Sequence, residues 1–200
     1  GNYWFNGIGH ISVDYEKVLK KGFNGIKDEV SDRLKDADDT DPAFIEKRAF
    51  YEALIIVLNA GISFAERFAA LAEKSAAEET DPVRKRELQQ IAGNCRNVPA
   101  NPARSFYEAC QLFWFVQLMI QLESNGHSIS PMRFDQYMYP YYEHDISAGI
   151  LSREDAQEIL DCLWVKFNDV NKIRDEDSTK GFGGYPMFQN LIVGGQYPDG

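Results

Sequence analysis

The chain has 200 residues, of which 44% are hydrophobic and 13% aromatic, so it can bury a core and is not expected to be disordered. Its 31 acidic residues outnumber its 21 basic residues and give a formal net charge of −10. This charge argues against nucleic acid or an anionic membrane as a partner, because both recruit clustered lysine and arginine.

The first 35 residues predict a loop followed by a helix. Glycines punctuate residues 1–13, which indicates loop or short extended structure. A helix is predicted to begin near Asp14, and its apolar stripe consists of Val18, Leu19, Ile26 and Val30.

Three dipeptides carry the same helix-start signal: Asp41-Pro42, Asp81-Pro82 and Asn101-Pro102. Each sets an N-cap side chain directly before a proline at the first helical position. The first of these helices should run to about residue 74 and the second over residues 83–95. Apolar residues at three- and four-residue steps predict a core-facing stripe on the first helix, made of Phe50, Leu54, Val57, Leu58, Gly61, Phe64 and Phe68.

The third helix, residues 106–122, is apolar on nearly every face, which predicts burial on all sides. Its most apolar part, residues 110–122, is interrupted by Gln111, Gln117 and Gln121 and is too short to cross a bilayer. Asn125-Gly126 then supplies a left-handed helix stop.

The last third of the chain mixes helix and strand signals. Residues 133–148 are rich in aromatics and broken by Pro140, and a further helix follows Ser152 with Asp155 completing a capping box. Residues 188–193 predict one short buried strand. The fold class is therefore mostly α, as expected of a helical layer with one or two strands belonging to a larger α/β protein.

The termini and the cysteines add context. The chain begins without methionine and stops inside a turn signal, so we expect both ends to be internal cuts. Cys95, Cys110 and Cys162 form no metal or disulfide pattern, so we expect no metal site and a reducing cytoplasm. No signal peptide is expected either, because no basic start precedes an apolar run.

Two histidines follow glycine, in Gly9-His10 and Gly126-His127-Ser128. Glycine allows a ligand to approach the backbone closely, and imidazole exchanges protons near neutral pH, so both could handle hydroxyl groups. A histidine near a helix end is more often a cap, and a serine after a helix stop is often a turn former. Local sequence leaves both interpretations open.

Other polar and aromatic residues carry weaker signals. Arg133 and Asp135 are two positions apart and cannot pair on a helix, so each should find its partner elsewhere. The tyrosines of residues 137–142 indicate packing rather than a cation cage, and His144 should be solvated. Nucleotide, zinc-hydrolase and serine-hydrolase motifs are absent.

Several long motifs, in order, resemble the glycyl radical enzymes of the pyruvate formate-lyase-like superfamily, over essentially the whole chain. They are Gly9-His10 with residues 14–19 (DYEKVL), residues 98–109 (VPANPARSFYEA), residues 123–130 (ESNGHSIS), residues 133–137 (RFDQY) and residues 188–195 (FQNLIVGG). Met132 stands where many members of the family carry glycine.

The resemblance implies a barrel of parallel five-stranded halves wrapped by helices, with residues 1–200 as an internal segment of the pyruvate formate-lyase-like domain. It also implies a thiyl radical on a Gly-Cys-x-Glu loop and a glycyl radical near the C-terminus. This chain contains neither element, so we expect it to be inactive alone and to bind no cofactor itself. The full-length parent would receive its glycyl radical from an activating enzyme that uses S-adenosylmethionine and an iron-sulfur cluster.

Within the family, His10 with His127 and Ser128 is similar to the glycerol and propane-1,2-diol dehydratases. The resemblance assigns His10 as the catalytic acid and His127, Ser128 and Asn2 as substrate-binding residues. It further implies a small diol substrate, anaerobic life, a cytoplasmic location and a homodimer. Another glycyl radical lyase, of the choline, hydroxyproline or formate-acetyltransferase type, remains an alternative. A non-catalytic helical binding module is the alternative from another class.

Overall fold

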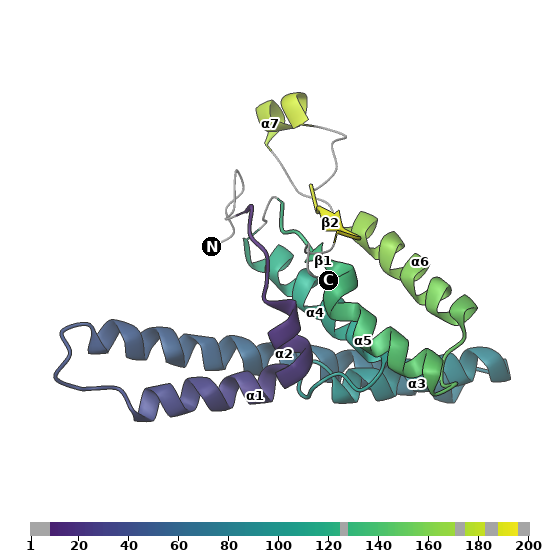
Figure 1. The fold of residues 1–200 in the computed structure, drawn as a ribbon, viewed down its shortest axis with the longest axis horizontal. Coiled ribbons are helices and arrows are strands. Elements are labelled where there is room, and N and C mark those ends of the chain that lie inside the picture. Colours follow the sequence, from purple (N-terminus) through teal and green to yellow (C-terminus); the bar gives the residue numbers. More distant parts are fainter. Residues whose placement is uncertain (1–8, 125–127, 171–174, 183–187, 196–200) are drawn as a thin grey trace. The chain divides into compact units, whose positions relative to one another are not determined.

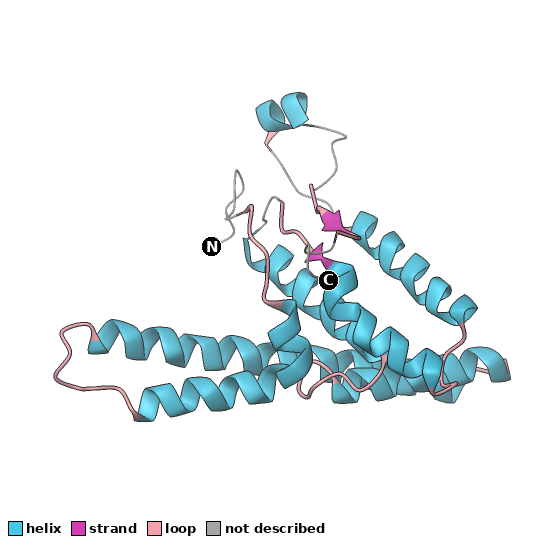
Figure 2. Cartoon of the chain, in the orientation of Figure 1, coloured by secondary structure: helices cyan, strands magenta, loops and turns pink. Residues whose placement is uncertain are grey.

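The computed structural model describes residues 9–124, 128–170, 175–182 and 188–195. The chain divides into two compact units, one of residues 16–103 and one of residues 1–15 with 104–200. Figures 1 and 2 show that the described elements are almost all helical, which confirms the mostly α prediction. In chain order they are α1 (Tyr15–Lys35), α2 (Phe44–Glu78), α3 (Pro82–Asn97), α4 (Phe106–Ser124), β1 (Met132–Arg133), α5 (Phe134–Ser147), α6 (Arg153–Asp169), α7 (Glu176–Phe182) and β2 (Leu191–Ile192).

Helix α1 begins where the sequence predicts but is kinked at Gly22, whose φ of 62° and ψ of 177° are not helical. The kink frees two backbone N–H groups, which donate to loop carbonyls: Phe23 to Pro99 at 2.7 Å and Asn24 to Ala100 at 2.9 Å. The Leu19 carbonyl accepts instead from the Ala103 N–H at 3.0 Å. These three backbone groups beside the kink are thus paired with the 99–103 loop.

Glycine is required at this kink for two reasons. A Cβ on residue 22 would lie 2.4 Å from the Asn101 carbonyl carbon and 2.7 Å from the Ala100 oxygen. The φ value also lies where side-chain-bearing residues are strained. Beside the kink, Glu29 forms ion pairs with Lys17 and Lys21. The loop at residues 98–103 therefore packs against the kink of α1 and forms hydrogen bonds with its backbone.

Helices α2 and α3 pack against each other, and Arg96 forms a two-pronged ion pair with Glu73, with N–O distances of 2.8 and 3.0 Å. The buried positions of α2 are small and fall in its second half: Gly61, Ala65, Ala69, Ala72 and Ala76. The predicted aromatic stripe was wrong in part, because Phe50, Val57 and Phe68 are exposed. Small residues let helix backbones approach closely, so the small positions, not the bulky ones, form this contact.

Of the three predicted helix starts, only Asp81-Pro82 is confirmed in full. The Asp81 carboxylate accepts from the Val83 N–H at 3.0 Å, with Pro82 in the first helical position. Asp41 instead organises a turn, since its carboxylate accepts from the Ala43 N–H at 2.8 Å, and α2 begins at Phe44. Asn101-Pro102 starts no helix because the backbone around it packs against the kink of α1.

Helix α4 is the centre of its unit, and both α5 and α6 pack on it. Its buried side chains confirm the prediction of a core helix, although Leu122 near its end is 61% exposed. The α4 N-terminus is capped twice: Ser105 accepts from the Glu108 N–H at 3.2 Å, and the buried Asp145 carboxylate accepts from the Phe106 N–H at 2.7 Å. The predicted capping box of α6, Ser152 with Asp155, is present in full.

Helix α5 corrects the expectation that Pro140 breaks residues 133–148, because the helix runs through this proline from Phe134 to Ser147. The predicted packing role holds for Tyr137 and Tyr142, whereas Tyr139 is 53% exposed. Tyr137 stacks on Tyr15 with ring centroids 5.4 Å apart and lies 5.7 Å from Phe134. His144 lies on the solvated side, as predicted, with its side chain 64% exposed.

Helix α2 is the single helix among the described residues that is long and apolar enough to cross a membrane, judged by length and composition. One such helix is weak evidence for a membrane span. None of residues 44–60 is buried, and its exposed large apolar side chains include Ile45, Phe50, Ile56 and Val57. An apolar surface of this extent normally has a partner.

Candidate active site

Three segments far apart in the sequence align in parallel in the unit that contains α4. Residue Ile11 forms a parallel bridge with Ile129, and the Ser130 N–H donates to the Ile11 carbonyl at 3.0 Å. Strand β1 pairs in parallel with β2, with Met132 opposite Leu191. The middle segment, residues 128–133, thus pairs with residue 11 at one end and with β2 at the other.

The predicted strand at residues 188–193 is shorter and less buried than expected. Only Leu191 and Ile192 are in β2, and Ile192 is 42% exposed. Among the described residues, β2 has one strand partner, β1. A strand is extended and buried only where neighbours cover it, and here one edge alone is paired.

The bridge brings two of the predicted site residues to matching positions. His10 and Ser128 each stand one residue before the bridged pair Ile11 and Ile129. Paired strands run about 5 Å apart, so the two residues start from neighbouring backbone positions. Both have positive φ, 57° and 59°, a conformation uncommon without glycine and frequent at functional sites.

Their surroundings differ: His10 is exposed, whereas Ser128 is only 6% exposed. A buried serine hydroxyl is held in a fixed environment, while an exposed imidazole can exchange protons with its surroundings. The other two predicted site residues, Asn2 and His127, lie outside the described residues.

Neighbouring polar side chains fix the backbone around this alignment. The Ser130 hydroxyl accepts from the Asn190 N–H at 3.1 Å and so links the middle segment to the start of β2. Arg133 donates to the Gly195 carbonyl at 2.8 Å, and the Asp135 carboxylate accepts from the Gly194 N–H at 2.7 Å. The prediction that Arg133 and Asp135 each find a partner elsewhere in the chain is confirmed.

The main component that sequence reasoning missed is a set of buried amides behind the aligned segments. Gln117 and Gln121 lie on α4 and are 0% and 5% exposed, and Gln189 lies two residues before β2. The hydroxyl of Tyr15 contacts Gln117, and burial raises the pKa of this hydroxyl, so it stays protonated. Glutamines interrupting an apolar helix were the available signal.

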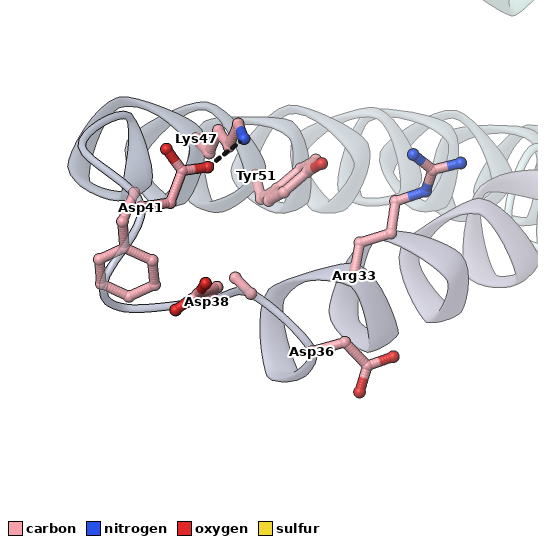
Figure 3. A pocket seen from close by; sticks show the side chains of 8 residues that line it. Arg33, Asp36, Asp38, Asp41, Lys47 and Tyr51 are labelled. Carbon is pink, nitrogen blue, oxygen red and sulfur yellow. Dashed lines mark hydrogen bonds and ion pairs between the residues drawn. The ribbon is translucent and has the colours of Figure 1, made fainter.

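Two hollows among the described residues lie away from this alignment. One is bordered by Arg33, Asp36, Asp38, Phe44 and neighbouring residues of the α1–α2 connection (Figure 3). Its Asp41 and Lys47 are paired with each other at 2.5 Å, which leaves both charges satisfied within the protein. A second hollow lies between α2 and α3. In the part of the chain that the structure describes, no cluster of His, Cys, Asp and Glu could hold a metal ion.

A helical layer beside short parallel strands is the arrangement expected of a segment from an α/β fold. The whole chain, residues 1–200, matches the family model described as pyruvate formate lyase-like, so it belongs to this family of glycyl radical enzymes.

Solved relatives agree closely with this structure. A Roseburia inulinivorans protein studied for 1,2-propanediol dehydration is 54% identical with a TM-score of 0.94, over 98% of this chain and 23% of its own. The glycerol-bound, B12-independent glycerol dehydratase of Clostridium butyricum is 55% identical with a TM-score of 0.92, over 100% of this chain and 25% of its own.

Among curated relatives, the isethionate sulfite-lyase of Nitratidesulfovibrio vulgaris is 43% identical over 94% of this chain and 23% of its own length. The chain therefore spans about a quarter of the length of the curated relatives it matches.

Proposed function

We propose that this chain is the substrate-hydroxyl-binding segment of a radical diol dehydratase, which eliminates water from glycerol or propane-1,2-diol. The parallel Ile11–Ile129 bridge carries the proposal, because it makes His10 and Ser128 neighbours although 118 positions separate them in sequence. The 54% and 55% identities to proteins of diol dehydration give further support.

The proposed roles follow from the chemistry of the side chains. A hydroxyl leaves as water only if its oxygen gains a proton, and an imidazole N–H at His10 can supply that proton. The Ser128 hydroxyl can donate and accept hydrogen bonds, which suits a substrate hydroxyl. His127 and Asn2 complete the proposed set that binds both hydroxyls of the diol.

The radical chemistry would come from the rest of the polypeptide. The family's glycyl radical would, by way of the thiyl radical on the Gly-Cys-x-Glu loop, supply the abstraction of a hydrogen atom from the substrate carbon that bears one hydroxyl. None of Cys95, Cys110 and Cys162 follows a glycine, so none fits the Gly-Cys-x-Glu loop. An S-adenosylmethionine and iron-sulfur activating enzyme, a homodimer and a cytoplasmic location belong to the same proposal.

The exposed apolar surface of α2 weighs against an independent helical binding module. A module that folds alone should cover its apolar side chains, whereas Ile45, Phe50 and Ile56 are 79%, 61% and 68% exposed. An internal segment would bury these side chains against the rest of a polypeptide about as long as the relatives.

A second candidate is another glycyl radical lyase. The 43% identity to an isethionate sulfite-lyase favours it, because the same family fold serves different substrates. Turnover of glycerol, propane-1,2-diol and isethionate by the activated full-length protein separates the two candidates.

The decisive variant is His10→Ala in the full-length protein. We expect diol dehydration to fall at least about 100-fold, as for loss of a general acid, while the glycyl radical signal in electron paramagnetic resonance is unchanged. His144→Ala, at an exposed histidine of α5, is the matched control and should retain activity. Loss of the radical signal in His10→Ala, or undiminished dehydration, would refute the assignment.

A further inference from the structure

The buried glutamines behind the aligned segments are too costly to be packing residues. An amide taken out of water without hydrogen bonds costs about 1–3 kcal/mol on mutational scales, and Gln117 is 0% exposed. A leucine or methionine would fill the same volume on α4 without that cost. The amide must therefore serve the contacts that it makes.

The contacts fix the orientation of Gln117. Its Nε2 lies 2.9 Å from the Ile129 carbonyl oxygen, which can only accept, so this end must be the N–H₂ group. The Oε1 end then faces Tyr15, and the tyrosine hydroxyl donates to it.

The partner amide is oriented by the same reasoning. Gln117 Nε2 also donates to Gln189 Oε1 at 2.7 Å, and Gln189 Nε2 donates to the Phe167 carbonyl at 3.3 Å. The Ile129 and Phe167 carbonyls can only accept hydrogen bonds, so the side-chain amides of Gln117 and Gln189 have one consistent orientation. Gln121 adds a weaker donation to Gln189 Oε1 at 3.4 Å.

Gln117 thereby contacts the middle aligned stretch directly and the other two through residues that adjoin them in sequence. Tyr15 is the first residue of α1, four positions after the bridged Ile11; Ile129 lies in the middle stretch between Ser128 and Ser130; and Gln189 lies two positions before β2. Ile129 is itself the residue bridged to Ile11. One side chain thus holds the middle stretch at its bridge point and ties it to both neighbours.

We propose that Gln117 is a positioning residue, which sets the 128–130 segment so that Ser128 faces the substrate beside His10. This inference rests on the proposed function, because it presumes that Ser128 binds a diol hydroxyl. Gln117 acts through the backbone of Ile129 and does not itself touch the substrate.

The test uses Gln117→Met in the full-length protein, since methionine has a similar length and no hydrogen-bonding amide. We expect amide hydrogen exchange to speed up in residues 128–132 while exchange in the rest of α4 and in α6 is unchanged. We also expect KM for the diol to rise at least about tenfold at unchanged glycyl radical yield, as for lost substrate positioning.

Two further variants keep the test decisive. Tyr15→Phe removes only the hydroxyl that donates to Gln117, keeps its ring contacts and should shift exchange and KM in the same direction by less. Gln111→Met, on the same helix at a half-buried position, is the matched control and should leave both unchanged.

Three outcomes overturn the inference: unchanged exchange at residues 128–132, faster exchange spread evenly over α4, α5 and α6, or faster local exchange with unchanged KM. A wild-type enzyme that turns over no diol refutes the proposed function instead. Exchange at residues 128–132 needs no turnover, so in that case it still decides whether Gln117 positions the segment.

Discussion

Replacing Gly22 with alanine should disrupt the contact between the kink of α1 and the 99–103 loop. The added Cβ would stand 2.4 Å from the carbonyl carbon of Asn101, which is closer than real Cβ atoms approach backbone. The backbone on one side of the contact must therefore move. Two hydrogen bonds hold that contact, from Phe23 to Pro99 and from Asn24 to Ala100.

The cost has two parts. A φ of 62° with a ψ of 177° is a conformation that glycine alone adopts readily, and alanine there costs about 1–3 kcal/mol. Each hydrogen bond lost on displacement costs about 0.5–1.5 kcal/mol. We expect Gly22→Ala to lower the local stability by about 4 kcal/mol in total.

Hydrogen exchange monitored by mass spectrometry in the full-length protein measures this local stability. A loss of about 4 kcal/mol speeds exchange of the Phe23 and Asn24 amides by about 10³-fold where local opening limits exchange. Gly93→Ala is the matched control: no atom lies within 4 Å of its added Cβ, and it sits inside α3. Alanine there should stabilise by about 0.5–1 kcal/mol. A Gly22→Ala effect below about 1 kcal/mol would refute this account of the kink.

Three further predictions concern pH, thiol reactivity and strand geometry. Hydrogen bonds from Lys17, then Lys21, lower the pKa of Glu29 from 4.5 to about 2. The stability that ionised Glu29 contributes to the fold should therefore be complete above pH 4.5 and be lost as the pH falls towards 2. Acid unfolding of Glu29→Gln should lack this loss of stability, and an acid-unfolding profile identical to that of the wild type would contradict the prediction. Burial raises the pKa of the Cys110 thiol to about 12. In the folded chain, iodoacetamide should therefore label the exposed Cys162 at least about 100-fold faster than Cys110, as measured by mass spectrometry. Equal labelling rates for the two cysteines would contradict this prediction. Met132 has a φ of 56°, a conformation in which a β-branched side chain is strained. In thermal unfolding, Met132→Gly should be nearly neutral, whereas Met132→Val should lower the stability by about 1–2 kcal/mol. A stabilising Met132→Val substitution would contradict the claim of backbone strain at this position.

The backbone geometry at position 132 is one that suits glycine. A residue at positive φ in β1 pays for its Cβ unless it is glycine, and here methionine occupies the position. Sequence resemblance identified Met132 as a departure, and the backbone explains why glycine suits the site.

The sequence by itself determined the features that depend on residues within one helical turn. Ser152 with Asp155 predicted the start of α6, and Asp81-Pro82 predicted the start of α3, because a cap involves only backbone groups two or three positions away. The mostly helical class followed from hydrophobic periodicity and the burial of α4 from its apolar composition on nearly every face, which are also properties of one segment.

Only the tertiary structure decided which equivalent local signals would be used. Asn101-Pro102 carries the same signal as Asp81-Pro82, but the backbone around it receives the kinked α1, and α4 begins instead at Phe106 under caps from Ser105 and the distant Asp145. Similarly, α2 buries alanines rather than its larger apolar residues, because its partner helix approaches along the small ones.

The candidate site shows the same division. Sequence pattern and resemblance singled out His10 and Ser128 as residues able to handle hydroxyls, but no local signal relates positions 118 residues apart. The Ile11–Ile129 bridge makes them neighbours, and the Gln117 amide holds that bridge from behind. Such pairings depend on hydrogen bonds between distant segments, which one-dimensional periodicity does not encode, so the types of side chain were readable from the sequence and their meeting point was not.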